Sequence, residues 1–281
     1  MAGRAASAAP EAAERHPPSS AEGTVSPSGK FTPANLGGVT NVPPPRTPAE
    51  AEAALRQGLN VRQTGSNTFQ IGRVEFDRQL RTVTVPARVT IRSQVVEYAL
   101  VNERGKAYES LLTTEASPTD IHVAFLLLGV GPMAVAGNLH EPLSVPDTNT
   151  VRIEFNWHTN GTPAPMALSD LLVLAKTPDD PAPRRLGLDR WLYNGSVLDA
   201  WGFAAQREGS IIALIRDPAA LVNNPAADRD DDTVHWPNLK ALPPEGTRGF
   251  LTFRLPTRPV APPRPPPPWA SPITPHSTNS Y

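Results

Sequence analysis

The sequence predicts an α+β domain that is mostly antiparallel β and contains one strongly marked buried helix at about residues 118–128. Apolar and polar residues alternate in several short runs, which is the period of half-buried strands. One apolar run instead carries both a start signal and a stop signal for a helix. Proline-rich stretches at both ends confine these patterns to the middle of the chain.

Proline sets the predicted domain limits. Of the 34 prolines in 281 residues, nine lie in residues 1–48 and ten in residues 256–281. Because proline lacks the N–H that continues a helix or a β-ladder, we predict a disordered Pro/Ala-rich tail over 1–48 and a disordered Pro-rich tail over 257–281. The globular domain is predicted to span residues 60–256, after a short surface helix at 48–58.

The first half of the domain is predicted to be a meander of about four antiparallel strands. Period-two alternation covers residues 69–71, 74–76, 83–85 and 87–91. Residues 92–94 have turn composition, so we expect residues 87–91 and 95–101 to form a hairpin. The next turn is expected at residues 102–106.

The helix signal is the clearest local pattern. Ser117 is a suitable N-cap, and Pro118 fits the first helical position. Asp120 stands three residues after the cap, as in a capping box, and Gly129 fits the left-handed stop. Nearly every residue after Ile121 is apolar, so the helix is predicted to be buried on most sides.

The second half contains further strand patterns. A strand is expected at 151–157, followed by an Asn160-Gly161 turn, whereas residues 168–175 fit a strand or a helix equally well. Residues 203–207 and 210–216 are predicted to be two strands joined at Glu208-Gly209. Residues 250–255 are predicted to close the sheet.

Composition excludes several classes of function. With 26 basic and 27 acidic residues the net charge is -1, so no bulk field attracts phosphate backbones, and nucleic acid is not an expected partner. The absence of cysteine excludes disulfides, thiolate metal sites and a cysteine nucleophile. The N-terminus shows no signal-peptide apolar run, and the most apolar segment, 123–136, is shorter than the roughly 20 residues of a membrane span.

Glu109, Ser110 and His122 are the candidate catalytic residues. They lie with Asp120 within 14 residues of sequence, and a histidine beside a carboxylate can exchange protons and activate a hydroxyl. The alternative is structural: Asp120 serves the helix start, and a histidine in an apolar helix is more commonly a hydrogen-bonded core residue. Ser110 has no G-x-S-x-G context.

The acidic run offers at most a weak metal site. Asp228, Asp230 and Asp232 have the spacing of the first half of a calcium loop. The sixth position is Thr233 and the twelfth is Leu239, where such a loop needs glycine and glutamate, so a solvated acidic loop is favoured. The histidines form no close pair, and Gly129-Val130-Gly131 lacks the third glycine of a dinucleotide loop, so no metal or cofactor is expected.

Aromatic and proline-rich segments suggest binding. Four aromatic residues among the turns of the second half either bind sugars or peptides by stacking or pack in the core, which is the commoner case. The C-terminal run at residues 262–269 is either a polyproline ligand for an aromatic groove or a spacer. The four aromatic residues are Trp191, Tyr193, Trp201 and Trp236.

Two blocks of sequence carry a family resemblance. The first block is Gly105-Lys106-Ala107-Tyr108-Glu109-Ser110-Leu111-Leu112, continued by residues 120–124 and 126–129. The second covers residues 208–214 and 217–225 and an acidic stretch that ends near Trp236. Together they resemble the bacterial YdjY-domain family, with the resemblance covering roughly residues 69–256. Glu208 and Trp236 are the candidate ligand-binding residues of this second block.

The resemblance implies no established reaction, but members are often exported or lie beside other domains, so an exported or envelope-associated location is expected from it. The iron-sulfur label of some relatives does not transfer, since this chain has no cysteine for thiolate ligation. We therefore expect a non-enzymatic binding or structural domain. The alternative is a hydrolase-like or metal-assisted enzyme that uses Glu109, Ser110 and His122, with Asp231 and Asp232 brought close by folding.

Overall fold

Short strands dominate the part of the chain that this computed structural model describes, which is residues 60–133, 146–157 and 165–256. The only α-helices in these ranges are α2 (Pro118–Leu127) and α3 (Ala204–Glu208). The domain is therefore mostly β, and the α+β class predicted from the sequence gave the helices too much weight. Within the described ranges, neither helix is long and apolar enough to cross a membrane. The predicted tails and the helix at 48–58 lie outside the described residues.

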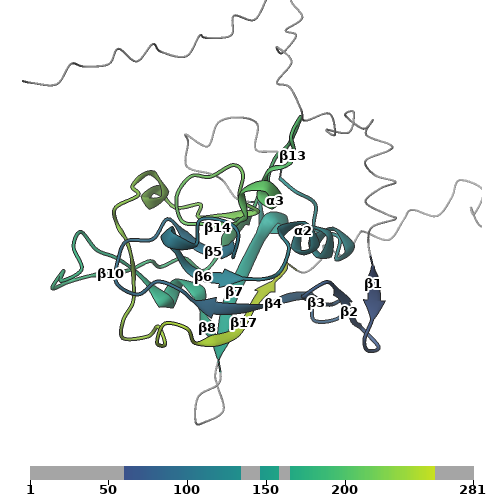
Figure 1. Ribbon diagram of the computed structural model, residues 1–281, viewed down its shortest axis with the longest axis horizontal. Coiled ribbons are helices and arrows are strands. Elements are labelled where there is room, and N and C mark those ends of the chain that lie inside the picture. Colours follow the sequence, from purple (N-terminus) through teal and green to yellow (C-terminus); the bar gives the residue numbers. More distant parts are fainter. Residues whose placement is uncertain (1–59, 134–145, 158–164, 257–281) are drawn as a thin grey trace, which may run out of the picture. The chain divides into compact units, whose positions relative to one another are not determined.

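Eight strands close into a mixed barrel (Figure 1). Their order around the barrel is β4, β17, β7, β11, β15, β14, β5 and β6, and the β4–β6 pairing closes the ring. An eight-stranded barrel is narrow enough for its side chains to fill the interior, and closure leaves no unpaired edge. The strands are β4 (Thr82–Val89), β5 (Tyr98–Asn102), β6 (Ser110–Thr114), β7 (Thr150–Trp157), β11 (Trp191–Tyr193), β14 (Ser210–Ala213), β15 (Val222–Asn223) and β17 (Arg248–Arg254).

The alternation seen in the sequence is the inside-outside pattern of the barrel. In β4 the residues Val83, Val85, Ala87 and Val89 are buried, whereas the alternate residues Thr84, Pro86 and Arg88 face outwards and are partly exposed. The strand β17 alternates in the same way, with Leu251 and Phe253 in the core. This period-two burial confirms the predicted strands at 83–85, 151–157 and 250–255.

The predicted hairpin between residues 87–91 and 95–101 is wrong. The strand β6 lies between β4 and β5, and it pairs antiparallel with β4 and parallel with β5. Every residue of β6 is buried, because other elements cover both of its faces. Such a strand shows no alternation, so local pattern could not reveal the insertion. A second parallel pair, β14–β15, makes the barrel mixed rather than antiparallel.

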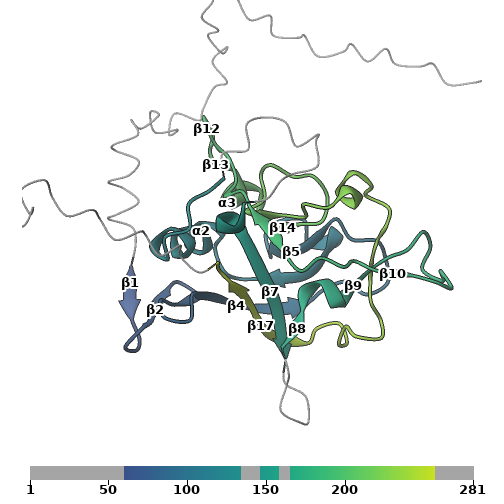
Figure 2. The ribbon, with the colours of Figure 1, turned by 180° about the vertical axis from the view of Figure 1, so that it is seen from behind.

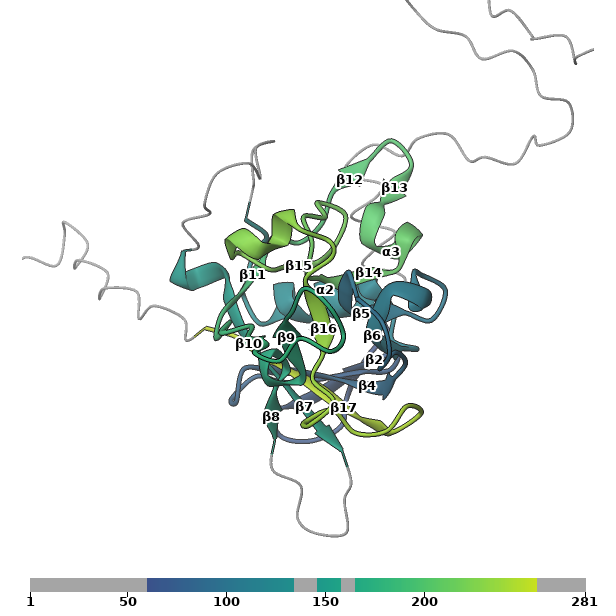
Figure 3. The same cartoon turned by 90° about the vertical axis from the view of Figure 1, so that its left-hand side faces the viewer.

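Smaller elements surround the barrel. Figures 1 and 2 show β1–β3 projecting on one side and β10 on the opposite side, and the β12–β13 hairpin extends from a third direction, as Figure 3 also shows. The 168–175 segment combines a 3₁₀ turn with a strand. The remaining strands are β1 (Val61–Gln63), β2 (Thr68–Ile71), β3 (Val74–Asp77), β8 (Met166–Ala167), β9 (Leu172–Leu174), β10 (Arg184–Arg185), β12 (Leu198–Asp199), β13 (Gly202–Phe203) and β16 (His235–Pro237); the 3₁₀ turns are η1 (Ala107–Glu109), η2 (Asp147–Asn149), η3 (Leu168–Leu171) and η4 (Ala227–Asp230).

The helix α2 begins and ends where the sequence predicts. The Ser117 hydroxyl accepts a hydrogen bond from the Asp120 N–H at 3.4 Å, and Gly129 has a φ of 76°. The burial prediction is wrong, because Leu126 and Leu127 are 44% and 49% exposed. Only one face of α2, which includes Ile121 and Phe125, packs on the barrel.

The helix α3 replaces the strand predicted at 203–207. Its sequence, Ala-Ala-Gln-Arg-Glu, consists of strong helix formers, and this propensity outweighs the short apolar start at Phe203. The Gln206 side chain accepts hydrogen bonds from the N–H and hydroxyl of Thr119 at 3.1 and 2.9 Å, so α3 also caps α2. Gly209 ends α3 in the left-handed conformation, with a φ of 74°.

Gly209→Ala is expected to lower the free energy of unfolding by about 2 kcal/mol or more. The left-handed conformation alone costs an L-residue roughly 1–2 kcal/mol. An added Cβ would also lie 2.8 Å from the Cα of Gly105, where only backbone could give way. Urea unfolding measures the effect. Gly131→Ala is the matched control, because a Cβ there meets nothing within 4 Å; equal stability of the two variants would contradict the prediction.

Candidate functional site

A hollow opens on the outer face of the barrel where β4 changes its neighbour. The first half of β4, Thr82 to Thr84, pairs with β3, whereas Arg88 and Val89 pair with β6. Pro86 lies between these two stretches, and its carbonyl accepts a 2.6 Å hydrogen bond from the Thr114 hydroxyl. The N and the C=O of one strand residue face the same side of the strand, so the nitrogen of Pro86, like its carbonyl, faces the gap and not β17. Proline therefore costs the β4–β17 ladder no hydrogen bond here. The gap has a volume of about 250 Å³.

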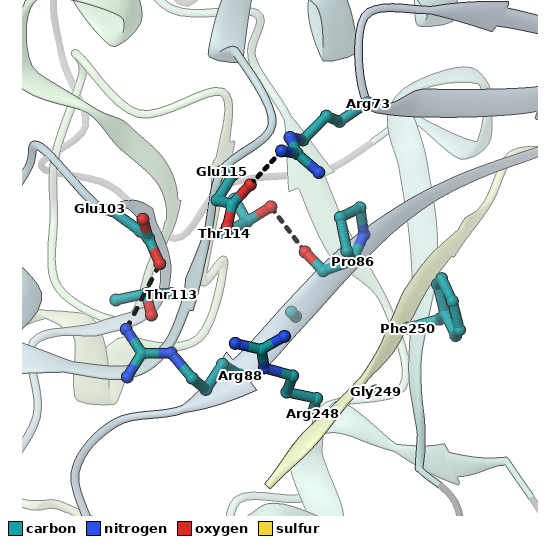
Figure 4. Close-up of a pocket in the computed structure, with 11 residues that line it drawn as sticks. Arg73, Pro86, Arg88, Glu103, Thr113, Thr114, Glu115, Arg248, Gly249 and Phe250 are labelled. Carbon is teal, nitrogen blue, oxygen red and sulfur yellow. Dashed lines mark hydrogen bonds and ion pairs between the residues drawn. The ribbon is translucent and has the colours of Figure 1, made fainter. Parts of the chain in front are cut away.

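Three arginines surround this hollow (Figure 4). Arg88 on β4 and Arg248 on β17 are direct cross-strand partners, so two like charges stand opposite each other on the same outer face. Arg73 reaches the hollow from the turn between β2 and β3. Like charges placed directly opposite on neighbouring strands destabilise a sheet by roughly 0.2–1 kcal/mol unless an anion lies between them.

Glutamates neutralise part of this charge. Arg88 forms a 3.3 Å ion pair with Glu103, and Arg73 forms a 2.6 Å ion pair with Glu115. All four side chains are more than two-fifths exposed, so water screens these pairs and a ligand can compete for them. Among the described residues, no acidic side chain forms an ion pair with Arg248.

A second hollow, of about 610 Å³, continues the first and shares Arg73, Glu103 and Glu115 with it. It adds Arg104, whose guanidinium has no ion-pair partner in the described part of the chain, and Arg207, which is paired with Asp199 at 3.0 Å. We call the two hollows together the arginine groove. Its charged lining residues are Arg73, Arg88, Arg104, Arg207, Arg248, Glu103 and Glu115.

The arginine groove also has an apolar end. Phe250, next to Arg248 on β17, lines the first hollow and is 51% exposed. It is the cross-strand partner of Pro86, so an aromatic ring and a proline ring flank the cationic part of the groove (Figure 4). A small number of polar groups beside an apolar wall is the usual composition of a ligand site.

The candidate catalytic residues Glu109, Ser110 and His122 do not line the arginine groove. The Ser110 hydroxyl is buried and donates to the Leu112 carbonyl at 2.7 Å. Glu109 lies beside Glu97, and both are near Lys106. His122 faces the other way, with its Nδ1 2.8 Å from the Tyr193 hydroxyl. No hydrogen bond or ion pair described for these residues joins Glu109, Ser110 and His122 to one another.

Burial keeps His122 and its partner Tyr193 in their uncharged forms. Desolvation lowers the pKa of His122 to about 4 and raises the pKa of Tyr193 well above its usual range. The Phe203 ring lies 4.9 Å from the imidazole, centroid to centroid. The imidazole is therefore uncharged at neutral pH and is held by a tyrosine hydroxyl.

The aspartates of the acidic run, residues 228–232, interact with different residues and do not face one common site. Asp228 accepts hydrogen bonds from the Asn224 amide at 2.7 Å and pairs with the buried His235 at 2.8 Å. Asp230 instead pairs with Arg216. In the described ranges no group of three or more His, Asp or Glu side chains, Asp232 included, has the arrangement of a metal site.

The remaining candidates have distinct positions. Glu208 forms a 3.1 Å ion pair with Arg207 and thus lies near the rim of the arginine groove. Trp236 is half-buried and lines another hollow, beside residues 177–181. Trp191 and Tyr193 are buried core residues, whereas Trp201 is 83% exposed on the turn between β12 and β13.

Sequence reasoning missed the arginine groove. Arg88 and Arg248 are 160 positions apart, and only the β4–β17 register brings them together. The available signal was their place in the alternation: each occupies an outward position of its strand, next to inward apolar residues. This signal marks a solvated face, and it cannot say which strands will be neighbours.

The fold and the site define the chain as a closed mixed β-barrel with a cationic groove on its outer face. Residues 74–254 match the YdjY domain, which is more than half of the chain, so the protein belongs to the YdjY domain family. Every charged residue of the arginine groove except Arg73 lies in the matched range. No curated protein and no solved structure matches the chain.

Proposed function

We propose that this domain is a non-enzymatic binding module that holds an anionic ligand in the arginine groove. The observation that carries the proposal is the direct opposition of Arg88 and Arg248 without an acidic partner for Arg248 among the described residues. Two adjacent guanidinium groups match the oxygen atoms of a phosphate or carboxylate, to which arginine donates paired hydrogen bonds. The envelope-associated location suggested by the family resemblance stays a prediction.

The arrangement favours a ligand with at least two anionic groups. Arg104, in the second hollow, is a further guanidinium without an ion-pair partner in the described ranges, so unpaired charge is present in both halves of the groove. Glu103 and Glu115 would be displaced from their arginines or would exclude ligands that approach in the wrong orientation. Phe250 offers an apolar contact for the uncharged part of such a ligand.

Arg248→Gln is expected to weaken the binding of pyrophosphate or citrate by roughly 10- to 100-fold. Hydrogen bonds to charged groups contribute about 1.5–3 kcal/mol, and each 1.4 kcal/mol is a factor of ten in affinity. Isothermal titration calorimetry of the full chain at low salt measures the dissociation constants of both probes. Arg184→Gln is the matched control, since Arg184 is an exposed strand arginine of β10 outside the groove.

The same variant also tests the electrostatic origin of the site. Removing one of the two opposed charges should leave the ligand-free stability unchanged or raise it by up to about 1 kcal/mol, because the repulsion with Arg88 is relieved. A loss of binding together with a loss of folding would therefore not count as support. Absence of pyrophosphate and citrate binding in the wild-type chain, or equal binding by all variants, would refute the proposal.

A further inference from the structure

A second pair of opposed arginines lies at the far end of β17. Arg254 is the register partner of Arg152 on β7. This repeats, at the end of the strand, the opposition of Arg88 and Arg248 at its start. Arg248 and Arg254 are six positions apart, an even number, so both are on the outer face of β17. The two arginine pairs are therefore about 20 Å apart along the strand.

The second arginine pair also lines a hollow, with a volume of about 410 Å³, to which Arg190 contributes as well. We call it the Arg152 hollow. All three of its arginines are exposed. Arg254 forms a 2.8 Å ion pair with Glu154, and Arg190 pairs with Asp147. Arg152 forms no ion pair in the described ranges, so it supplies a positive charge that no side chain there neutralises.

Uncharged side chains separate the two arginine pairs on β17. Phe250 and Thr252 are the outward residues between Arg248 and Arg254. The ring of Phe250 is half exposed beside the first pair (Figure 4). The Thr252 hydroxyl lies 3.1 Å from the hydroxyl of Thr84 on β4. We call these four outward residues of β17, with their cross-strand arginines, the β17 face.

The spacing of the β17 face selects for a long ligand. An anion the size of pyrophosphate can contact one arginine pair but cannot extend over 20 Å to the other. A linear polymer that repeats an anionic group along its length can contact both. Sugar units suit the middle of the face, because their C–H surfaces stack on an aromatic ring and their hydroxyls bond to threonine hydroxyls. A bare polyphosphate chain would make no use of Phe250.

We propose that the β17 face binds one chain of an acidic polysaccharide. Its carboxylates contact Arg248 and Arg88 at one end and Arg152 at the other, and a sugar ring between them stacks on Phe250. This inference rests on the proposed function and names its ligand class, since the arginine groove holds one end of the chain.

The length of the ligand provides the first test. Digalacturonate is shorter than the distance between the two arginine pairs, whereas octagalacturonate is longer. Octagalacturonate should bind the full chain at least tenfold more tightly, because its second contact is made without a second loss of free motion. Isothermal titration calorimetry at low salt measures both dissociation constants.

Arg152→Gln tests the far end of the β17 face. The variant should bind octagalacturonate roughly tenfold more weakly than the wild type, because one contact between a guanidinium and a carboxylate is lost. Its binding of pyrophosphate through Arg248 should be unchanged. Arg184→Gln again serves as the matched control, because it removes an exposed strand arginine from β10. Circular dichroism should show that both variants are folded, since both positions are exposed.

Phe250→Leu tests the assignment to a sugar polymer. Loss of the ring face should weaken octagalacturonate binding by roughly two- to tenfold and leave pyrophosphate binding unchanged. Equal binding of octagalacturonate by this variant and the wild type would overturn the assignment. Tighter binding of single-stranded oligothymidylate of equal length than of octagalacturonate would also overturn it, because the ligand would then be a nucleic acid.

The two proposals fail in different ways. If pyrophosphate binds through Arg248 but octagalacturonate gains nothing over digalacturonate, or ignores Arg152→Gln, the extended site is wrong and the arginine groove stands. If neither pyrophosphate nor citrate binds the wild-type chain, the proposed function is refuted and this inference with it.

Discussion

Phe125→Ala is expected to lower the free energy of unfolding by about 3–5 kcal/mol, the range seen when a fully buried aromatic ring is removed from a core. Phe125 is 0% exposed, and its ring centroid lies 4.6 Å from that of Tyr193 and 5.4 Å from that of Phe253. It therefore joins α2 to two strands of the barrel. Since a domain is stable by only about 5–15 kcal/mol, this loss would leave the variant close to unfolding at ambient temperature.

Leu126→Ala is the matched control for this prediction. Leu126 follows Phe125 on the same helix but is 44% exposed, so its truncation should cost no more than about 0.5 kcal/mol. Urea unfolding followed by circular dichroism gives both values. A similar loss in the two variants would contradict the one-sided packing of α2, and it would restore the sequence-based expectation of a helix buried on most sides.

The second large effect is an acid sensitivity that arises from His122. Its pKa is about 4 in the folded protein because burial disfavours the imidazolium, whereas an unfolded chain has a value near 6.5. The unfolded chain therefore binds the proton first. The stabilisation is fully present above pH 6.5 and is lost as the pH falls towards 4, by up to about 3 kcal/mol.

Chemical unfolding at a series of pH values between 7.5 and 4 measures this loss. His122→Asn is the comparison variant, because an asparagine oxygen can still accept a hydrogen bond from Tyr193 but cannot be protonated in this range. Its stability should fall much less between pH 6.5 and 4 than that of the wild type. An identical pH dependence of the two proteins would show that His122 is already charged or exposed when the protein is folded.

Local sequence signals correctly predicted the elements whose ends or burial pattern depend only on residues close in sequence. The caps of α2 at Ser117 and Gly129 are satisfied within a few residues, so no knowledge of the tertiary fold was needed. The strands β4, β7 and β17 have one face in the core and one face outwards, and alternation reveals that directly.

The pairing of the strands could not be predicted in this way. The strands β5, β6 and β14 are almost entirely buried, so their sequences carry no sign of which face meets which neighbour. The insertion of β6 between β4 and β5 follows from packing of the whole barrel. For the same reason the catalytic hypothesis placed Glu109, Ser110 and His122 together from their closeness in sequence, whereas Ser110 lies within a buried strand and His122 packs against Tyr193.

The candidate site depends on the same long-range pairing. Arg88, Arg104 and Arg248 belong to separate parts of the chain and lie in one groove only when the ring of strands is complete. Charge counting could not detect it, because the overall net charge is -1 and the groove is a local excess. A search for outward arginines on strands would have listed Arg88 and Arg248 together with the ones on other faces, and it would have missed Arg104, which lies in the turn after β5.

Closure of the barrel through β4 and β17 has a consequence for how the protein folds. Residues 82–89 must find residues 248–254, so β17, which leaves the ribosome after the other strands of the described ranges, completes the ring. Until then β4 and β7 each keep an unsatisfied edge, which can recruit other chains. Such distant contacts make folding slow, on the scale of milliseconds to seconds for β-rich domains. A chain cut before residue 248 would therefore be exposed to aggregation, and not simply be a shorter version of the same domain.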